Sequence, residues 1–272
     1  MKLSKDTNIL IVGLGLLGGS YAEALTKKGY TVNAVTKEQS SVDFALEKGI
    51  INYGTTKLDK SIISAADLVI FALYPHVFTE WIEKNQHLLK SGAVITDVTG
   101  VKGCIVYKIQ EILRPDVEFI AAHPMAGREV CGGENSDSGI FRGANYIVVP
   151  TEKNTAGAIE LCRDLGEKLG FHRVAELSPE KHDEMIAFLS QLTHCIAVTL
   201  MCCNNTPDLE YYTGDSFRDL TRIARINDEM WSELFLLNRQ NLLDDLDILI
   251  SSLQEYRHAI AENDGQRLTQ LL

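Results

Sequence analysis

The sequence predicts an α/β protein in which an N-terminal, doubly wound Rossmann-type parallel sheet precedes an all-helical C-terminal domain. A glycine-rich turn at Gly13 joins an apolar strand to a helix near the N-terminus. Short apolar strands then alternate with helices, which implies parallel strands joined by crossover helices. After about Leu177 the apolar residues recur only at helical spacing. We therefore expect a dinucleotide-binding domain over 1–177 and a helical substrate-binding and dimerisation domain over 178–272.

The glycine-rich turn predicts a dinucleotide site. The strand Ile9–Val12 leads into a Gly-x-Gly-x-x-Gly pattern, and a helix is expected over Tyr21–Lys28. The three glycines permit the tight turn, the approach of a pyrophosphate and the packing of helix on strand. Amides at the helix start then face the phosphates. An ordinary glycine-rich turn is the alternative, which the flanking strand and helix disfavour. The predicted cofactor contacts here are Gly13, Gly15, Leu16, Leu17 and Gly18.

The second strand, expected over Thr31–Val35, bears on the choice of cofactor. In this fold its end carries an Asp or Glu for the ribose hydroxyl of NAD. Here Thr36 and Lys37 follow the strand, and a hydroxyl beside a cation suits the 2′-phosphate of NADP better. Glu38, an acid two residues after Thr36, leaves NAD as the alternative cofactor. We predict NADP in preference to NAD, with Thr36 and Lys37 as contacts.

The alternation continues to about residue 150. Ligands of such sheets bind beyond the carboxyl ends of the strands. Three segments therefore lie near the reactive end of the cofactor: Tyr74-Pro75, Asp97–Gly100 and His123–Gly127. Strands are expected over Asp67–Ala72, Ala93–Asp97, Phe119–Ala122 and Tyr146–Val149, and helices over Val42–Lys48, Tyr74–Leu89 and Lys102–Leu113.

Composition and charge exclude several classes of function. With 272 residues, 45% hydrophobic and 23% charged, the chain is typical of a soluble globular protein. Its formal net charge of −11 argues against nucleic acid and anionic membrane surfaces, because both need a basic field. Six cysteines without zinc-type spacing indicate reduced thiols in a cytoplasmic protein and no metal site. No window reaches the roughly 18 continuous apolar residues of a spanning helix.

His123 is the candidate for proton transfer in the first domain. It ends an apolar strand, is followed by Pro124, which we expect to end the pairing, and has the pKa range that a general base needs. A histidine that caps a strand is the alternative, and position alone leaves both open.

The helix that starts near Lys181 carries three further polar residues. Ser190 and His194 lie one turn apart on one face, with His182 at the helix start. A polar stripe is the alternative to a site.

A cluster of arginines follows in Phe217–Arg225. Arg218, Arg222 and Arg225 are expected on roughly one helical face, where they can grip carboxylates bidentately. A salt-bridged, solvated face is the alternative. Asp215 is most simply the N-cap of this helix.

Taken together, these motifs resemble those of the prephenate/arogenate dehydrogenase family of tyrosine biosynthesis, over essentially the whole chain. The motifs, in order, are Gly13-Leu-Gly-Leu-Leu-Gly-Gly-Ser20, Asp97-x-x-x-Val-Lys102, His123-Pro-Met-Ala-Gly-x-Glu129, His182-Asp183, Ser190-x-x-x-His194, Phe217-Arg-Asp-x-Thr-Arg-Ile-Ala224 and Met230-Trp231.

The resemblance implies an NAD(P)-dependent dehydrogenase that acts on prephenate, with arogenate as the rival substrate. The strongly apolar helical half of the chain independently predicts a homodimer formed through the helical domain. His123 is implied as the base that takes the ring-hydroxyl proton, with Ser190 and His194 as further catalytic residues. Independently of the resemblance, the positions of Tyr74, Pro75 and Thr99 after the strand ends predict them as cofactor contacts. The implied substrate-binding residues are Arg222, Glu129, Thr99, His182, Asp215, Asp219 and Trp231.

Three positions depart from the family pattern. Thr99-Gly100 replaces Gly-Ser, so the serine that orients the catalytic histidine is absent, and Thr99 is its candidate replacement. Gln191 replaces a usual histidine. Asp215 replaces a glycine that is frequent near the substrate, where a carboxylate can pair with the ammonium of arogenate.

Two other readings remain. A β-hydroxyacid dehydrogenase-like reductase would use a lysine in an interdomain helix, but the stretch around Lys181 lacks the accompanying glycine-rich pattern. A non-catalytic dinucleotide-sensing protein would need neither His123 nor Arg222.

Overall fold

The computed structural model describes residues 2–128, 130 and 132–272. The chain divides into two compact units, Met1–His182 and Asp183–Leu272. The division falls within helix α7 (Pro179–Ile186). Glu129, for which we expected a role in substrate binding, lies outside the described residues, as does Cys131.

A six-stranded sheet forms the centre of the N-terminal unit, and all its strands are parallel. The strand order is β3-β2-β1-β4-β5-β6. The order reverses between β1 and β4, which is the point where dinucleotides bind in doubly wound sheets. The expected Rossmann-type fold is therefore confirmed. The strands are β1 (Ile9–Val12), β2 (Val32–Val35), β3 (Tyr53–Thr55), β4 (Leu68–Phe71), β5 (Val94–Asp97) and β6 (Glu118–Phe119).

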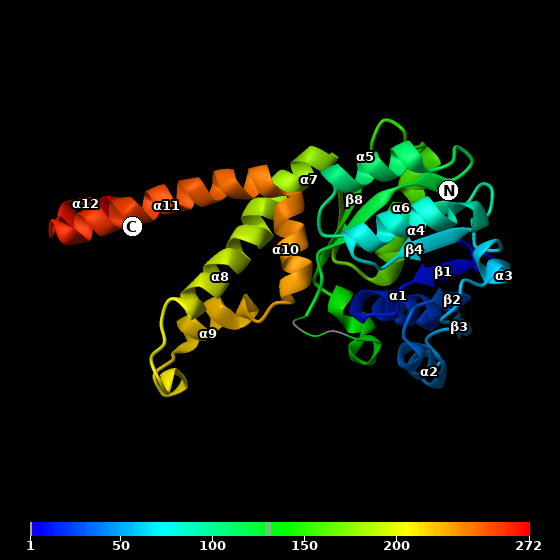
Figure 1. Ribbon diagram of the computed structural model, residues 1–272, viewed down its shortest axis with the longest axis horizontal. Helices are drawn as coiled ribbons and strands as arrows, with labels where there is room; N and C mark the ends of the chain where they lie inside the picture. Colours follow the sequence, from blue (N-terminus) through cyan, green and yellow to red (C-terminus); the bar gives the residue numbers. More distant parts are fainter. Residues whose placement is uncertain (1, 129, 131) are drawn as a thin grey trace. The chain divides into compact units, whose positions relative to one another are not determined.

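Helices cover both faces of this sheet (Figure 1). Ile9 and Ile11 of β1 point into one core, together with residues of α1 and α6, whereas Leu10 points into the other with residues of α4 and α5. Because the central strands are buried on both faces, they form continuous apolar runs. The helices are α1 (Leu16–Lys27), α2 (Gln39–Glu47), α3 (Lys60–Ile63), α4 (Pro75–Asn85), α5 (Gly103–Ile112) and α6 (Ala156–Leu169).

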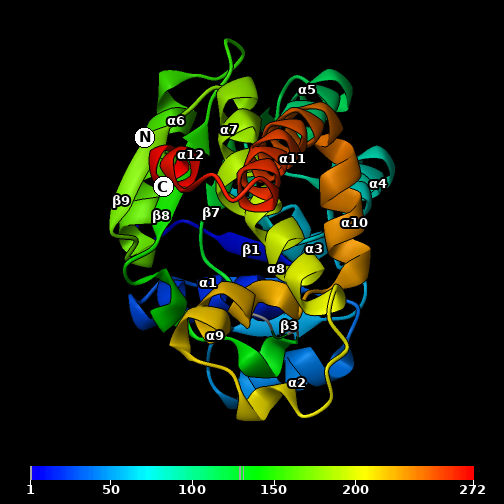
Figure 2. The ribbon, with the colours of Figure 1, turned by 90° about the vertical axis from the view of Figure 1, so that its left-hand side faces the viewer.

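A separate three-stranded sheet contains the next strands, β7 (Ala121–Pro124), β8 (Asn145–Val149) and β9 (Arg173–Glu176), side by side in Figure 2. β7 and β8 are antiparallel, and β8 and β9 are parallel. Our expectation that the strands predicted over Phe119–Ala122 and Tyr146–Val149 both continue the parallel sheet was wrong. The apolar run Phe119–Ala122, predicted as one strand, is divided between β6 and β7. Its first residue belongs to the six-stranded sheet and its last two belong to the three-stranded sheet. The pairing also continues through Pro124, which lies opposite Tyr146.

The elements described in the C-terminal unit are helical, as expected. The short helix α12 folds back along α11 (Figure 1), and the Tyr256 hydroxyl donates to the Leu271 carbonyl at 2.6 Å. After α7 come a π-helical segment η4 (Ala187–Leu192), α8 (Thr193–Cys202), α9 (Asp215–Thr221), a 3₁₀ turn η6 (Arg222–Ala224), α10 (Asp228–Leu237), α11 (Arg239–Ala261) and α12 (Gly265–Leu271).

One helix in the described ranges, Pro179–Cys202, is long and apolar enough to cross a membrane, judged by length and composition alone. Its apolar run is not continuous, because Ser190, Gln191 and His194 interrupt it. Only 28% of its most apolar window is buried within the protein. The same test is passed by helices of soluble proteins, so it does not by itself indicate a membrane.

Candidate active site

The glycine-rich turn has the geometry of a dinucleotide cradle. Gly13 has φ +99°, and a side chain there would run into the carbonyl of Ala72, the residue just after the neighbouring strand β4. A Cβ on Gly18 would overlap the Gly13 carbonyl. Around Gly15, by contrast, the space is open, so a phosphate can approach the backbone. Helix α1 begins one residue later, at Leu16, and its first amides are available to an anion.

The end of β2 supplies the groups expected to contact the adenosine ribose. The Thr36 hydroxyl accepts a hydrogen bond from the Leu14 amide at 3.3 Å, so it is tied to the glycine-rich turn. The Lys37 side chain is 92% exposed, and its ammonium lies 4.0 Å from a Glu38 carboxylate oxygen. The positive charge at the strand end is therefore partly balanced by Glu38.

The residues after β4 also have the expected position. Tyr74 is the N-cap of α4 and Pro75 is its buried first residue. β4 lies next to β1 in the sheet, so this segment follows the strand beside the glycine-rich turn.

His123 lies on β7 and is partly buried, opposite Ile147 of β8. Its Nδ1 is 2.8 Å from Nε2 of His182, which is fully buried at the start of α7. When Nδ1 of His123 donates in this pair, the lone pair of His123 is at Nε2, the nitrogen that a base presents to a hydroxyl. His182 is thus placed to orient His123, a role that we did not expect for it.

Three influences hold the pKa of His123 well below 6.5. Desolvation is the largest, followed by the charges of His182 and Lys102. Each disfavours the imidazolium, so His123 is neutral at physiological pH and able to accept a proton.

A buried ion pair lies at the end of β5. Nζ of Lys102 is 2.6 Å from Oδ2 of Asp97, and both side chains are fully buried. Oδ1 of Asp97 accepts from the Ala122 amide at 3.2 Å, next to His123. The Thr99 hydroxyl donates to Asp97 and is 3.0 Å from the Val101 carbonyl.

Thr99 is therefore not the replacement for the missing serine. Its side chain is 4% exposed and its hydroxyl faces Asp97, whereas the partner of His123 is His182. The sequence motif included Asp97 and Lys102 but gave no reason to assign them a role.

Ser190, His194 and Trp231 come together in the C-terminal unit. Nδ1 of His194 is 2.8 Å from the Ser190 carbonyl, one turn earlier. The Trp231 ring, on α10, stacks on the imidazole with 3.8 Å between centroids and 30° between planes. Ser190 and His194 are one turn apart, as expected, and the hydrogen bond between them uses the backbone carbonyl of the serine.

The arginine segment differs from the expected helical face. Helix α9 ends at Thr221, Arg222 starts a 3₁₀ turn, and Arg225 is in an extended conformation, so the three arginines do not share one α-helical face. Arg222 and Asp219 are exposed.

Asp215 does not cap this helix. It is the first helical residue, and Gly214 is the N-cap. Its side chain is 91% exposed and pairs with Arg218 three residues later. A ligand ammonium would therefore compete with Arg218 for this carboxylate.

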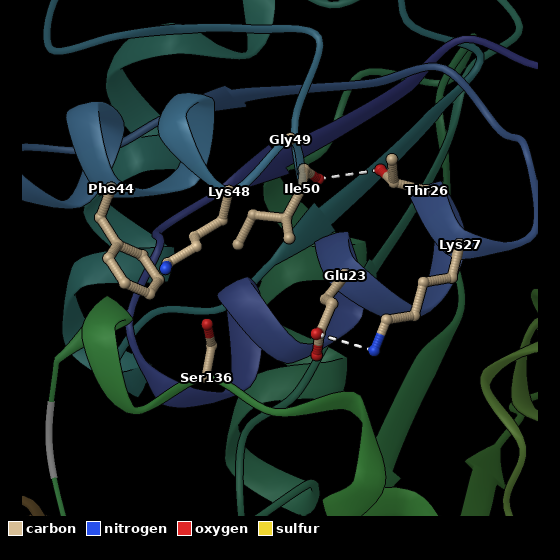
Figure 3. Close-up of a pocket in the computed structure, with 8 residues that line it drawn as sticks. All are labelled: Glu23, Thr26, Lys27, Phe44, Lys48, Gly49, Ile50 and Ser136. Carbon is tan, nitrogen blue, oxygen red and sulfur yellow. Dashed lines mark hydrogen bonds and ion pairs between the residues drawn. The ribbon is translucent and has the colours of Figure 1, made fainter.

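A cavity of about 490 Å³ lies beside the C-terminal turns of α1 and α2 (Figure 3). Several of its polar groups already have partners: Lys27 pairs with Glu23 at 2.8 Å, and Thr26 donates to the Ile50 carbonyl at 2.8 Å. Helix C-termini disfavour anions, so the cavity is not assigned to the cofactor. The described lining residues are Glu23, Thr26, Lys27, Phe44, Lys48, Gly49, Ile50 and Ser136.

Two family models match the chain. Residues 21–175 match the model described as prephenate dehydrogenase, nucleotide-binding domain, and residues 178–272 match prephenate dehydrogenase, dimerization domain.

Individual proteins give the same picture. A prephenate dehydrogenase from Bacillus subtilis is 29% identical, over 98% of this chain and 74% of that protein. The crystal structure of Aquifex aeolicus prephenate dehydrogenase in complex with hydroxyphenyl propionate and NAD+ is 32% identical, covers 100% of this chain and 96% of that chain, and has a TM-score of 0.88. Synechocystis arogenate dehydrogenase is 26% identical, with 97% and 95% covered and a TM-score of 0.80.

Proposed function

Because the chain belongs to the prephenate dehydrogenase family, we propose that it catalyses the oxidative decarboxylation of prephenate to 4-hydroxyphenylpyruvate, in tyrosine biosynthesis. The observation that carries the proposal is the 2.8 Å contact that orients His123 against His182, on a strand that is tied to the end of β5 through Asp97. Burial lowers the pKa of His123, which suits a base. A protein that only senses a dinucleotide has no need of such a base.

In the proposed reaction Nε2 of His123 accepts the proton of the ring hydroxyl, while hydride leaves the ring carbon that carries this hydroxyl. When bound, the oxidised nicotinamide supplies the hydride acceptor. The resulting dienone loses CO₂ from the ring carbon that carries the carboxylate, and the bonding electrons pass to the ring oxygen. The proton then returns from His123 to that oxygen, so the base is regenerated. Decarboxylation is driven by aromaticity, so the protein contributes mainly position.

The other residues receive roles from their chemistry and from the family pattern. Arg222 binds a substrate carboxylate, for which a guanidinium is suited. His194 and Ser190 are assigned to the substrate, with Trp231 holding the imidazole. Asp219 is assigned to the surroundings of Arg222. Glu129 keeps its implied role in substrate binding.

The assay is the formation of NAD(P)H together with chromatographic detection of 4-hydroxyphenylpyruvate when purified protein meets prephenate. His123→Asn should lower kcat by roughly 10²–10⁴-fold, with the affinity for the cofactor unchanged. A protein that binds the dinucleotide yet forms no product from prephenate or arogenate contradicts the proposal.

For the cofactor we propose NADP in preference to NAD. The support is the absence of an acid at Thr36, the last residue before Lys37, and a Thr36 hydroxyl tied to the glycine-rich turn. The ion pair of Lys37 with Glu38 weakens the preference. The Aquifex aeolicus relative was crystallised with NAD+, so NAD is the second candidate cofactor.

For the substrate we propose prephenate, with arogenate as the second candidate. The observation that favours arogenate is the carboxylate of Asp215, which can attract an ammonium. Its existing partner, Arg218, reduces that attraction.

We also propose a homodimer in the cytoplasm. The C-terminal unit leaves a set of large apolar side chains exposed, and the family model for this region is described as a dimerization domain. Cys104, Cys162, Cys195, Cys202 and Cys203 are free thiols, which suits a reducing compartment. The molar mass in solution tests the dimer. The exposed apolar residues include Phe188, Leu189, Met201, Leu236, Leu243, Ile248, Ile250, Leu253 and Ile260.

A further inference from the structure

Gln191 is a buried amide in the π-helical segment η4 of the C-terminal unit. Its side chain is 1% exposed. Nε2 donates to the Leu234 carbonyl at 2.9 Å, and Oε1 accepts from Nδ2 of Asn238 at 2.9 Å. Nδ2 of Asn238 also donates to the Asp183 carbonyl at 2.8 Å. A buried amide held through both of its polar ends fixes the relative position of the segments that it joins.

The segments joined in this way are the two that hold the His194 ring. Gln191 is next to Ser190, whose carbonyl bonds Nδ1 of His194. Leu234 lies three residues after Trp231 on α10, about one helical turn along the same helix. The imidazole is therefore bonded to one helix and stacked on the other, and the Gln191 side chain ties the two helices together beside it.

The same bonds lie where this helix departs from α geometry. Ala187–Leu192 is π-helical, and such turns are rare, occur as short insertions and are frequent at functional sites. A segment in this conformation persists where tertiary bonds hold it. Here Gln191 lies inside the π-helical segment, and the Asp183 carbonyl lies in the preceding turn.

We propose that Gln191 is a positioning residue for His194. Its two amide bonds hold the π-helical turn against α10, so that the Ser190 carbonyl and the Trp231 ring keep the imidazole in one orientation. With Nδ1 donating to the carbonyl, the neutral ring has its lone pair at Nε2. The link to catalysis rests on the proposed function, which assigns His194 to the substrate, whereas the orientation of the ring does not depend on it.

Gln191→Met tests the proposal, because it keeps most of the side-chain volume and removes both hydrogen bonds. The KM for prephenate should rise about tenfold, the equivalent of two modest buried hydrogen bonds. kcat should change less than KM, and the KM for the cofactor should stay the same. The matched control is Gln240→Met, since Gln240 is exposed and bonds Asp244 on its own helix, at 2.8 Å, and should behave like the parent.

A second readout does not need activity. The chain has two tryptophans, so Trp81→Phe leaves Trp231 as the only indole. Its emission should be quenched in acid by the imidazolium of His194 stacked on it, and Gln191→Met should reduce that quenching. A Gln191→Met protein with the parent's KM and the parent's quenching overturns the proposal. Reduced quenching in a protein that is inactive toward prephenate supports it and contradicts the proposed function instead.

Gln191→His is the second variant, and it decides the question if the methionine variant does not fold. A neutral imidazole has one donor and one acceptor, so it can replace both amide bonds. Acid quenching of Trp231 should then persist, with KM within about threefold of the parent. The opposite result is a Gln191→His protein that folds, loses the acid quenching of Trp231 and raises KM as much as is expected for Gln191→Met. That result would show that the hydrogen bonds of Gln191 do not position His194.

Discussion

Replacing His182 by leucine removes the group that orients the proposed base, His123, and leaves the base itself in place. We predict that His182→Leu lowers kcat for prephenate by roughly 5- to 30-fold and moves the acid limb of kcat/KM to higher pH. The substitution removes the partner 2.8 Å from Nδ1 of His123 and leaves His123 itself in place. The reaction therefore continues, with a base whose ring and tautomer are no longer fixed.

The magnitude follows from the kind of bond that is lost. One buried hydrogen bond contributes about 0.5–1.5 kcal/mol, and 1.36 kcal/mol is a factor of about ten in rate. Loss of tautomer control adds to this. The total stays below the roughly 10²–10⁴-fold loss expected when the base is removed.

The shift of the acid limb follows from the charges around His123. The base acts in its neutral form, so activity falls as the pH drops through its pKa. Desolvation, His182 and Lys102 hold that pKa below the ordinary value, and removing His182 takes one of these influences away. The pKa of His123 then rises toward 6.5, and activity is lost at a higher pH. In the parent, the depressed pKa also means that the free energy of unfolding falls as the solution is acidified from about pH 6.5.

The assay is a pH profile of kcat and kcat/KM for the parent, His182→Leu and His182→Gln. The glutamine amide reaches the position of Nε2 and keeps an acceptor for His123 but carries no charge. It should restore most of kcat while showing the same shifted acid limb as leucine. If His182→Leu has the parent's kcat and an unmoved acid limb, and only melts earlier, His182 is a packing residue and the assignment fails.

Three further outcomes are expected. Arg222→Ala should raise the KM for prephenate by an amount worth roughly 2–5 kcal/mol if the carboxylate pair is desolvated, measured by steady-state kinetics; a normal KM in a less stable protein would indicate a salt-bridged surface. We expect the parent to have a higher kcat/KM with NADP+ than with NAD+, and Lys37→Ala should lower the ratio of the two values. A parent enzyme with equal kcat/KM for both cofactors refutes the proposed preference. Asp215→Asn should lower kcat/KM for arogenate relative to prephenate by less than about tenfold, because Arg218 already engages the carboxylate, and unchanged ratios exclude an ammonium contact.

The extent to which the sequence predicted the fold depends on burial. β1 and β4 are buried on both faces and were predicted from their apolar runs alone. The edge strands β3 and β9 are partly exposed and carry no such run, so periodicity did not reveal them. The antiparallel pairing of β7 with β8 was also beyond prediction, because an apolar run does not specify which sheet it joins.

The candidate site was predictable where spacing alone carries the chemistry, as in the glycine-rich turn. The partner of His123 was not, because His182 is 59 residues away and the bond exists only in the folded chain. For Asp215 the error was one residue in the position of the helix start, which made Gly214 the N-cap instead. An error of one residue thus changes the role of the Asp215 side chain from helix cap to partner of Arg218, although the fold is the same.

The buried pair of Asp97 and Lys102 connects the fold to the base. Taking both charges out of water costs more than a surface pair returns, so such a pair is weak evidence for stability, whereas removing one partner typically costs about 3–5 kcal/mol. The pair matters here because it fixes the position of β7 relative to β5. One oxygen of Asp97 is held by Lys102 at the end of β5, and the other accepts from the Ala122 amide at the start of β7. The first sheet thereby fixes the second beside the residue that precedes His123, and the charge on Lys102 disfavours the imidazolium. One carboxylate thus sets where the base lies, and its partner helps to keep that base neutral.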